Sequence, residues 1–569
     1  MFIFKKKLDS IENTLNTNNI DQEQCRNIYA DIFNMTEPAS KNDIYNNLEI
    51  YKDYNGGAES TIFTQINKAT TISGEIFLKH RLDNATTDIA VLTEQRREVE
   101  ALAQHSQFIE TKLKDLAHLE RNIIPYCHNF IAQDQIIGST MVNFKPLNFL
   151  NGNELFLNLY NNYNIFSPIY NLISPLIIVL IPFLIAKLYF IKDLNFGKYQ
   201  GLFNFIFIGV PTFSLPNNKS VMAMAKFMFT IAMYIYTLYT ASSFSLSTQK
   251  ILRIVHDRLV NLKHYLGIIR ELQTKFKTVV DIFGGDIYYP VLDDPIYDKP
   301  YNIISNKGKL LRHYTIINSD NENIKKSLTI LGKIDCLYTI SILVRDYGYN
   351  FAEFVANRQT PAVFSKNFFH PNIDTAIPNT IDIGFKGRRN VILTGPNAGG
   401  KSTLIKTLSI SILMAQTLGI APCEKMYLTP FTYMNTYLNI HDIKGKKSLF
   451  ENEMERISTH IDKLKELKPT DFAFIIIDEL FSGTNPKEGM ATSFAVAEKL
   501  AQFPNSISVI TTHYHQLTEL KDYAKYKMEL DTYKLQAGVS TDNIAVDLLK
   551  QRNFDQSIVD KAREITDKA

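Results

Sequence analysis

The sequence predicts an α/β domain in the C-terminal part of the chain, joined to a helical part that a hydrophobic segment interrupts. Three observations predict this fold class. A glycine-rich loop separates a strand-like apolar run from a helix-like apolar run within residues 391–418. A second apolar run ends in the acidic pair Asp478 and Glu479. Two long uncharged stretches fall within residues 151–249.

Length and composition set the outer limits. The chain has 569 residues, more than one hydrophobic core of about 250–300 residues supports, so we expect several domains. The net charge of +3 gives no overall signal for nucleic acid. The four cysteines form no C-x-x-C pair, so we expect neither a disulfide framework nor a zinc site. We expect the protein to occur in a reducing compartment. The apolar start at residues 1–4 is too short for a secretory signal.

The first part of the chain reads as helical. We expect an N-terminal helical segment over residues 1–55 and the first part of a helical core over residues 56–150. Apolar residues recur at helical spacing between residues 61 and 105, as in successive amphipathic helices.

Residues 151–249 form a hydrophobic insert. No charged residue lies between Glu154 and Lys187 or between Lys226 and Lys250, and we expect transmembrane helices at 168–191 and 227–247. The alternative is a pair of buried core helices. Residues 199–218 are also uncharged but are broken by glycine and proline, so we expect a re-entrant or interfacial piece there.

The side of the membrane follows from charge and topology. Basic residues dominate 248–277, just past the second span, which favours the cytoplasmic side for the C-terminal part. If the helices before residue 150 pack with those after residue 250, the number of spans is even, and we expect two. Lys192, Lys198 and Lys219 would then lie in the far loop, against the usual charge bias.

Helices resume over residues 250–360. Apolar residues recur from Ile251 to Leu272, which predicts a long lever-like helix. Residues 284–300 contain three prolines and read as a loop. We expect a further helix over residues 331–354.

Residues 395–402 fit the pattern G-x-x-x-x-G-K-[ST] between the buried-strand run 391–393 and the helical run 404–418. This context predicts a P-loop, whose backbone N–H groups surround the phosphates of a nucleotide at the positive end of a helix. Lys401 would reach the β- and γ-phosphates, and the Ser402 hydroxyl would bind Mg²⁺. The predicted nucleotide-binding residues here are Gly395, Pro396, Asn397, Ala398, Gly399, Gly400, Lys401, Ser402 and Thr403.

Two further strands end in side chains of matching chemistry. Residues 474–477 are apolar and precede Asp478, which would hold Mg²⁺, and Glu479, which would polarise the attacking water. Residues 508–512 lead to His513, which can sense the γ-phosphate or orient the water. Lys401, Glu479 and His513 are therefore the predicted catalytic residues, and a nucleoside triphosphate with Mg²⁺ is the predicted ligand.

These pieces, in this order, resemble the MutS family. The family's loop T-G-P-N-M-G-G-K-S-T differs from residues 394–403 only at Ala398. Residues 478–484 match D-E-x-x-x-G-T, and residues 511–518 match T-T-H-Y-x-x-L-T. His370 with Pro371 resembles the H-P element near the adenine pocket, and residues 448–454 resemble S-T-F-x-x-E-M. Residues 70–99 and 334–337 resemble helices of the family's core.

The resemblance implies an ABC-type P-loop ATPase domain at residues 361–569, ending in helices that help the family dimerise. His370 would then border the nucleotide, and Ser448 would complete the ATP site of a partner subunit, so a homodimer with two composite sites is expected. Leu449 replaces the family's usual threonine. ATP binding, ATP hydrolysis and DNA binding are the family activities that the resemblance implies.

Two features set this chain apart from mismatch-sensing members. The core resemblance begins near residue 56, which leaves no room for a mismatch-reading domain. Among the family activities, true mismatch recognition is therefore the one that the resemblance supports least. The hydrophobic insert occupies the place of the DNA-gripping clamp. We therefore expect a dimeric ATPase tethered to a membrane through residues 168–247, with its ATPase domain on the cytoplasmic side, acting on DNA in repair or recombination. The alternative is an ABC-like membrane-anchored mechanoenzyme that acts on a membrane or protein partner without DNA.

Overall fold

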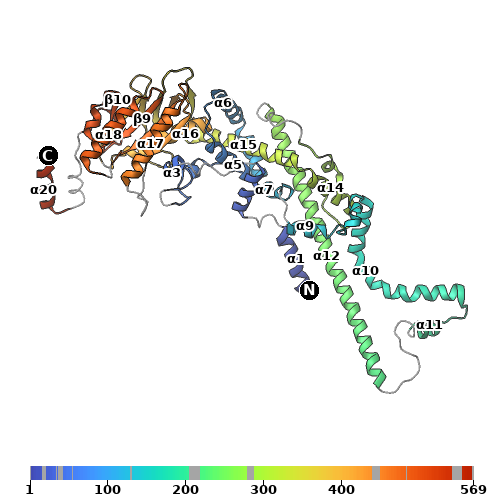
Figure 1. The fold of residues 1–569 in the computed structure, drawn as a ribbon. Helices are drawn as coiled ribbons and strands as arrows, with labels where there is room; N and C mark the ends of the chain where they lie inside the picture. The colour runs from blue at the N-terminus through green and yellow to red at the C-terminus, as the bar shows by residue number, and fades with distance from the viewer. Residues whose placement is uncertain are drawn as a thin grey trace. The chain divides into compact units, whose positions relative to one another are not determined.

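The computed structural model describes residues 2–15, 21–33, 35, 43–53, 56–127, 131–203, 218–277, 287–396, 398–438, 449–481, 484–540 and 554–566. The chain divides into two compact units, which are described separately (Figure 1). Unit 1 comprises residues 1–28, 118–275 and 283–328, and unit 2 comprises residues 29–117, 276–282 and 329–569.

Unit 1 is helical, and its longest element is α12 (Asn218–Lys275), which packs against α10 (Glu154–Ile185), α14 (Lys307–Ser319) and α1 (Phe2–Leu15). Its smaller elements are part of α2 (Gln22–Ile32), α8 (Ile124–Cys127), α9 (Ile131–Gly138), α11 (Phe196–Phe203), a π-helical turn at Ala186–Phe190, and 3-10 turns at Lys145–Gly152, Pro290–Asp293 and Pro295–Asp298.

The second half of α12 forms the centre of unit 1. Apolar residues such as Leu259 and Leu262 are fully buried at helical spacing, as the sequence predicts for a lever-like helix. The buried Arg258 guanidinium donates to the carbonyl oxygen of Leu15 at 2.6 Å and to Oε1 of Gln133 at 2.9 Å. These bonds join α12 to chain segments that precede residue 150, because a buried cation must find acceptors.

Two of the described helical stretches are long and apolar enough to cross a membrane. The first, Glu154–Phe190, contains the predicted span 168–191 except its last residue, and none of its most apolar window is buried. The second, Glu322–Asp346, is 78% buried over that window and is therefore a core helix. The predicted span 227–247 within α12 is not among the two, because tyrosine, threonine and serine are mixed with its apolar residues. The predicted span 227–247 therefore stays a prediction. Most of the predicted re-entrant piece, 204–217, lies outside the described residues.

Unit 2 contains two sheets. The five-stranded sheet has the order β3-β2-β6-β1-β5, and the six-stranded sheet has the order β11-β10-β4-β9-β8-β7. The strands of the first are β1 (Asn350–Phe354), β2 (Val363–Phe368), β3 (Asn379–Ile383), β5 (Ile420–Ala421) and β6 (Lys425–Leu428). Those of the second are β4 (Asn390–Thr394), β7 (Tyr433–Tyr437), β8 (Ala473–Asp478), β9 (Ser506–Thr511), β10 (Tyr523–Met528) and β11 (Leu535–Ala537).

The helices of unit 2 border these sheets and form a separate helical part. They are α3 (Asp43–Asn47), α4 (Ile62–Ile66), α5 (Ile72–Asp83), α6 (Ile89–Ala103), α7 (Ser106–Glu120), the later part of α15 (Glu322–Asp346), α16 (Lys401–Leu418), α17 (Leu449–Glu466), α18 (Pro486–Ala501), the 3-10 turn His515–Glu519 and α20 (Gln556–Thr566).

The central strands of the six-stranded sheet are parallel and buried. Strand β4 pairs in parallel with β10 and β9, and β8 pairs in parallel with β9 and β7. Every residue of β4 and β9 is buried, as the continuous apolar runs predict for parallel strands covered on both faces. Because the strands are parallel, β4, β8 and β9 end at one edge, and the residues that follow them meet there.

A buried carboxylate joins α5 to α15. Asp335 accepts hydrogen bonds from the backbone N–H groups of Thr70 and Thr71 and from the Thr71 hydroxyl, at 2.7–3.2 Å. Burial raises the pKa of Asp335 to about 6, against the lowering effect of these bonds. Gly74 lies directly against Asp335, where a Cβ atom would be 2.2 Å from a carboxylate oxygen. The two predicted core segments, 70–83 and 334–337, are therefore packed together.

The predicted helix over 331–354 is wrong at its C-terminal end. Helix α15 ends at Asp346, Gly348 adopts a left-handed φ of 74°, and residues 350–354 form β1. Strand β1 pairs with β5 and β6, which lie about 70 residues later in the chain. Apolar periodicity cannot anticipate such distant partners, and their pairing outweighs local helical spacing.

Candidate functional site

The glycine loop, residues 395–403, connects β4 to α16 with a backbone that few residues can adopt. Gly395 has φ 149°, and Gly400, which precedes the first residue of α16, has φ 83°. Ala398 also has a positive φ, 63°. These left-handed positions fold the chain back over the N-terminus of α16, where unpaired N–H groups and the helix dipole favour an anion. Asn397 lies outside the described residues.

Lys401 is buried at the start of α16. Its Nζ donates to the carbonyl oxygens of Gly395 and Pro396, both at 3.0 Å, and lies 3.4 Å from Nε2 of His513. Burial lowers the pKa of Lys401, while the carboxylates of Glu479 and Asp478 oppose that effect. The ammonium group is therefore held beneath the loop by acceptors that a phosphate can replace.

The acidic pair lies at the end of β8, beside β9. The hydroxyl of Thr511 donates to Oδ1 of Asp478 at 2.5 Å and accepts from the N–H of Glu479 at 3.1 Å. Glu479 has a positive φ of 53°, an uncommon conformation for a residue other than glycine. Its Oε1 lies 2.8 Å from Nε2 of His513, and this hydrogen bond is the main cause that lowers the pKa of Glu479.

The structure thus brings the three predicted catalytic side chains together. His513 contacts both Lys401 and Glu479, although the three come from different elements. The two predicted metal ligands are not joined: no hydrogen bond connects Ser402 with Asp478 in the described part of the chain. Ser402 faces the cavity instead, and Asp478 is held by Thr511.

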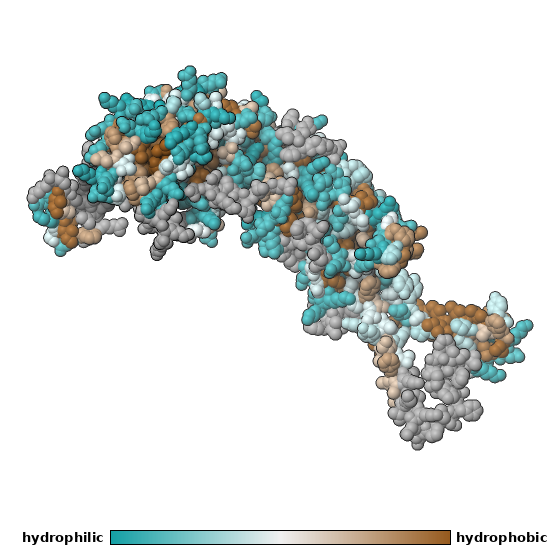
Figure 2. All heavy atoms as spheres, viewed as in Figure 1, coloured by the Kyte–Doolittle hydropathy of each residue, from teal (hydrophilic) through white to brown (hydrophobic). Residues whose placement is uncertain are grey.

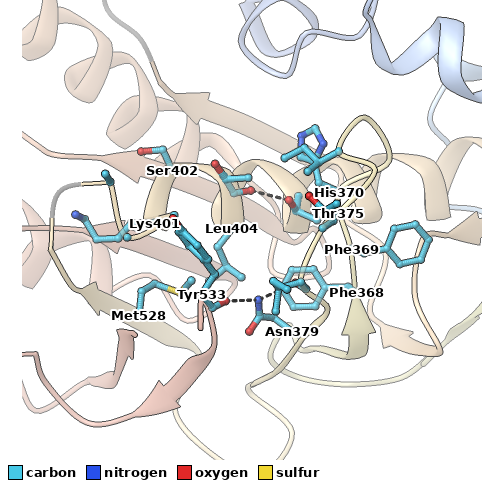
Figure 3. A pocket seen from close by; sticks show the side chains of 18 of the residues that line it. Phe368, Phe369, His370, Thr375, Asn379, Lys401, Ser402, Leu404, Met528 and Tyr533 are labelled. Carbon is cyan, nitrogen blue, oxygen red and sulfur yellow. Dashed lines mark hydrogen bonds between the residues drawn. The ribbon is translucent and has the colours of Figure 1, made fainter. Parts of the chain in front are cut away.

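A cavity of about 450 Å³ lies beside the glycine loop. Residues 398–404, Glu479 and the predicted residue His370 line it, so most of the predicted nucleotide-binding residues share one space. Figure 3 shows Ser402, Lys401 and Met528 on one side of this cavity and His370 and Phe368 on the other. Burial lowers the pKa of His370 to about 4, so its imidazole is neutral at pH 7.

Sequence reasoning missed the walls of this cavity. Tyr533, Met528 and Asn379 line it together with residues of β2 and of the segment 373–377. Asn379 donates to the Tyr533 carbonyl oxygen at 3.0 Å and accepts from the N–H of Leu535 at 2.7 Å, which holds the β10–β11 turn over the loop. A Cβ atom on Gly400 would lie 3.2 Å from the Tyr533 ring. No spacing in the sequence links these positions to the glycine loop.

Ser448, predicted to complete a partner's site, lies outside the described residues, as do residues 541–553 of the predicted dimerisation region. No group of three or more histidine, cysteine, aspartate or glutamate side chains that could hold a metal ion occurs in the residues that the structure describes.

The C-terminal part of the chain matches a known protein family. Residues 391–569 match the family described as MutS domain V. The DNA mismatch repair protein MutS of Staphylococcus haemolyticus is 27% identical over 295 residues, which is 48% of this chain and 32% of that protein. The endonuclease MutS2 of Thermus thermophilus is 29% identical over 273 residues, 45% of this chain and 34% of that protein. The endonuclease MutS2 of Lactobacillus gasseri is 34% identical over 212 residues, 34% of this chain and 26% of that protein. The chain therefore spans about a third or less of the length of these curated relatives.

Proposed function

The chain belongs to the MutS family, and from this premise we propose that it binds ATP with Mg²⁺ and hydrolyses the ATP to drive a step of DNA repair or recombination. The observation that carries this proposal is the cluster of Lys401, Glu479 and His513 beside the cavity under the glycine loop. The names of the relatives, a mismatch repair protein and an endonuclease, support the DNA part.

A P-loop NTPase fold of the ABC type is part of this proposal. The parallel arrangement β10-β4-β9-β8-β7 supports it, with the glycine loop after β4 and the acidic pair after β8. The proposed ATPase domain comprises residues 361–569, with the helical core on either side of the hydrophobic insert at 56–150 and 250–360.

The residues of the cavity, together with Asp478 at the end of β8, fit a nucleotide with a divalent cation. Lys401 would exchange its two carbonyl acceptors for phosphate oxygens, and the amides of the loop would surround the phosphates. Ser402 and Asp478 would hold Mg²⁺, with Thr511 orienting the carboxylate of Asp478. When bound, Mg²⁺ supplies a positive charge that stabilises the phosphates. His370 and Tyr533 would border the base, and a neutral His370 suits an uncharged ring.

Water activation would rest with Glu479 and His513. A carboxylate whose pKa is lowered stays ionised and can accept a proton from water at neutral pH. His513, 2.8 Å from Oε1 of Glu479, would hold that carboxylate in position. The same imidazole contacts Lys401, so phosphate binding at Lys401 and the position of the base are linked through one side chain.

We also propose that the working form is a homodimer attached to a membrane, with the ATPase domain on the cytoplasmic side. The family resemblance of residues 448–454 supports composite sites, in which closure depends on the γ-phosphate. The exposed apolar length of α10 supports the membrane attachment. Mismatch recognition itself is not included in the proposal.

That exposed apolar helix favours one alternative function, a membrane-anchored mechanoenzyme that uses the same ATPase cluster on a membrane or protein partner without DNA. The two functions share the chemistry of ATP hydrolysis. They differ in whether DNA changes its rate.

The test is the ATP hydrolysis rate of the full-length protein in vesicles, without DNA and with duplex, mismatched or branched DNA. We expect stimulation by at least one DNA form and loss of turnover by about 10²-fold or more in Glu479→Gln. Glu488→Gln, an exposed acid in the first turn of α18, is the matched control and should keep full activity. Turnover that Glu479→Gln does not reduce would contradict the ATPase assignment. Turnover that no DNA changes would contradict the DNA part and favour the alternative.

A further inference from the structure

The second half of α10, from Leu172 to Ile185, exposes apolar side chains around most of its circumference. From Leu172 to Ile185 most large side chains are exposed, among them Leu176 at 61% and Ile178 at 53%. Ser174 is the one hydroxyl side chain in this stretch, and no ionisable residue occurs in it. Figure 2 shows this part of α10 as a continuous hydrophobic surface. A helix without a polar face suits neither water nor the plane of a membrane surface.

Aromatic residues flank the aliphatic stretch. Tyr163 and Tyr170 precede it, and Tyr189 and Phe190 follow it, and all four are exposed. The 19 steps from Tyr170 to Tyr189 span about 29 Å at about 1.5 Å per residue. The hydrocarbon core of a bilayer is about 30 Å thick, and aromatic residues gather at its two interfaces.

Basic residues gather just beyond the C-terminal end of α10. Lys187, Lys192 and Lys198 are exposed there, with Asp193 as the one acid among them. Lys187 lies in the π-helical turn Ala186–Phe190 that follows α10, where its long side chain can reach a headgroup while its stem stays in the apolar layer. This end is therefore complementary to the anionic phosphates of lipid headgroups.

Two of the three prolines in α10 have their lost hydrogen bond replaced. Pro168 and Pro175 each lack the N–H that would bond to the carbonyl four residues before, on Asn164 and Asn171. The preceding hydroxyls, of Ser167 and Ser174, donate to those same carbonyls at 2.8 Å and 3.0 Å.

Such replacement matters most where water cannot supply it. Hydroxyl side chains that satisfy freed carbonyls are one means by which helices carry proline inside a membrane. The third proline, Pro182, follows Ile181 and has no such hydroxyl beside it. The replaced hydrogen bonds therefore lie in the turns around Pro168 and Pro175, where the helix enters the apolar layer.

We propose that α10 crosses a lipid bilayer at full depth, with Tyr170 and Tyr189 at the two interfaces and Ile178 near the centre of the hydrocarbon. The occupant of its apolar surface is lipid. This inference rests on the proposed membrane attachment and adds its depth, its end points and its orientation.

The absence of tryptophan from the chain makes depth measurable. Single variants Tyr170→Trp, Ile178→Trp and Tyr189→Trp of the full-length protein are reconstituted into vesicles of phosphatidylcholine with anionic phosphatidylglycerol. Lipids brominated at shallow or deep positions along the acyl chain then quench the fluorescence. We expect deep bromines to quench Ile178→Trp most, with emission shifted to shorter wavelength, and shallow bromines to quench the other two. Val91→Trp, exposed on α6, is the control and should be quenched by neither.

Equal shallow depth at all three positions would overturn the proposal, because α10 would then lie along the interface. Flotation with vesicles but no quenching at any of the three would also overturn it and would place the attachment elsewhere. Failure to float at all would overturn both this inference and the proposed attachment, while ATP turnover, measured separately, would still decide the proposed ATPase.

The serine hydroxyls provide a second measurement. Ser167→Ala with Ser174→Ala should lower the fraction of protein that stays in vesicles after a carbonate wash by about tenfold, and Ser167→Thr with Ser174→Thr should keep it. Ser319→Ala removes a similar hydroxyl-to-carbonyl bond at the exposed C-terminal end of α14 and should change nothing. An unchanged fraction in the double alanine variant would overturn the role given to the two hydroxyls.

Discussion

At the scale of single residues, Lys401 is the side chain that we expect to contribute most to nucleotide binding. Its ammonium group is buried with two backbone carbonyls as acceptors, so its removal leaves the loop without its cation. We expect Lys401→Ala to raise the Kd for ATP by about 10- to 100-fold, the size of a lost hydrogen bond to a charged group. Binding of a fluorescent ATP analogue measures this. Lys406→Ala, on the same helix but paired with Glu49 at 2.9 Å, should keep the affinity. Equal affinity in wild type and Lys401→Ala would contradict the loop assignment.

The contact of His513 with Glu479 predicts a pH effect. The hydrogen bond from His513 holds the pKa of Glu479 below its usual range, while burial acts in the opposite direction. Glu479 therefore remains an ionised base to a lower pH than an ordinary glutamate. In His513→Ala the largest lowering cause is lost, and burial, which raises the pKa of Glu479, is opposed only by the charge of Lys401, so the acidic limb of kcat should move to higher pH.

Turnover measured from pH 4 to pH 8 tests this shift. His515→Ala, on the exposed turn two residues later, should leave the limb where it is in the wild type. A limb that stays in place in His513→Ala would show that another group controls the base.

At the scale of elements, the contact of α5 with α15 holds the helical part of unit 2 together. Gly74 allows Asp335 to approach the N-terminus of α5, where Thr70 and Thr71 bind its carboxylate. Gly74→Ala would place a Cβ atom 2.2 Å from that carboxylate. We expect this overpacking to lower the free energy of unfolding by about 1–3 kcal/mol.

Urea unfolding of the full-length protein measures the change. The control is Gly267→Ala in α12, where a Cβ atom would meet nothing within 4 Å. There alanine should raise stability by about 0.5–1 kcal/mol, because glycine is the poorer helix former. If Gly74→Ala unfolds at the same urea concentration as the wild type, the two helices are not packed as closely as described.

At the scale of the whole molecule, the proposed ATPase cluster and the proposed membrane helix are separable functions. Ile177 and Ile181 are exposed on α10, so lysine at both positions disturbs no packing but introduces two charges into the apolar stretch. A charge at the centre of a bilayer costs about 2.5–3.5 kcal/mol or more. We expect Ile177→Lys with Ile181→Lys to move the protein from the membrane to the soluble fraction while its basal ATP turnover is unchanged.

Fractionation of expressing cells, together with a turnover assay, tests this separation. Ile304→Lys, at a residue of unit 1 that is 87% exposed, should leave the protein in the membrane fraction. Retention of the double lysine variant in carbonate-washed membranes would show that α10 is not the anchor.

Much of the fold was predictable because its signals are local. The strands β4, β8 and β9 and the helix α16 follow from short, largely apolar runs that lead to glycine, acidic residues or a histidine. The strand β1 was not predictable, since its partners β5 and β6 come much later in the chain. The second predicted span, 227–247, is not among the described helices apolar enough to cross a membrane, because a stretch without charge can still be rich in hydroxyl groups. Tyr533 and Asn379 line the cavity because a hydrogen bond joins Asn379 to the β10–β11 turn, and no sequence motif marks that turn.

The sequence by itself determined the resemblance to the MutS family, the glycine loop and the residue types at the ends of three strands, because spacing along one segment dictates those features. Only the tertiary structure decided that His513 lies between Lys401 and Glu479, that Thr511 rather than Ser402 holds Asp478, and that α10 keeps its apolar surface exposed. These are distances between segments far apart in the chain. They depend on the parallel order of the strands and on which helical faces find partners, and neither can be read from local spacing.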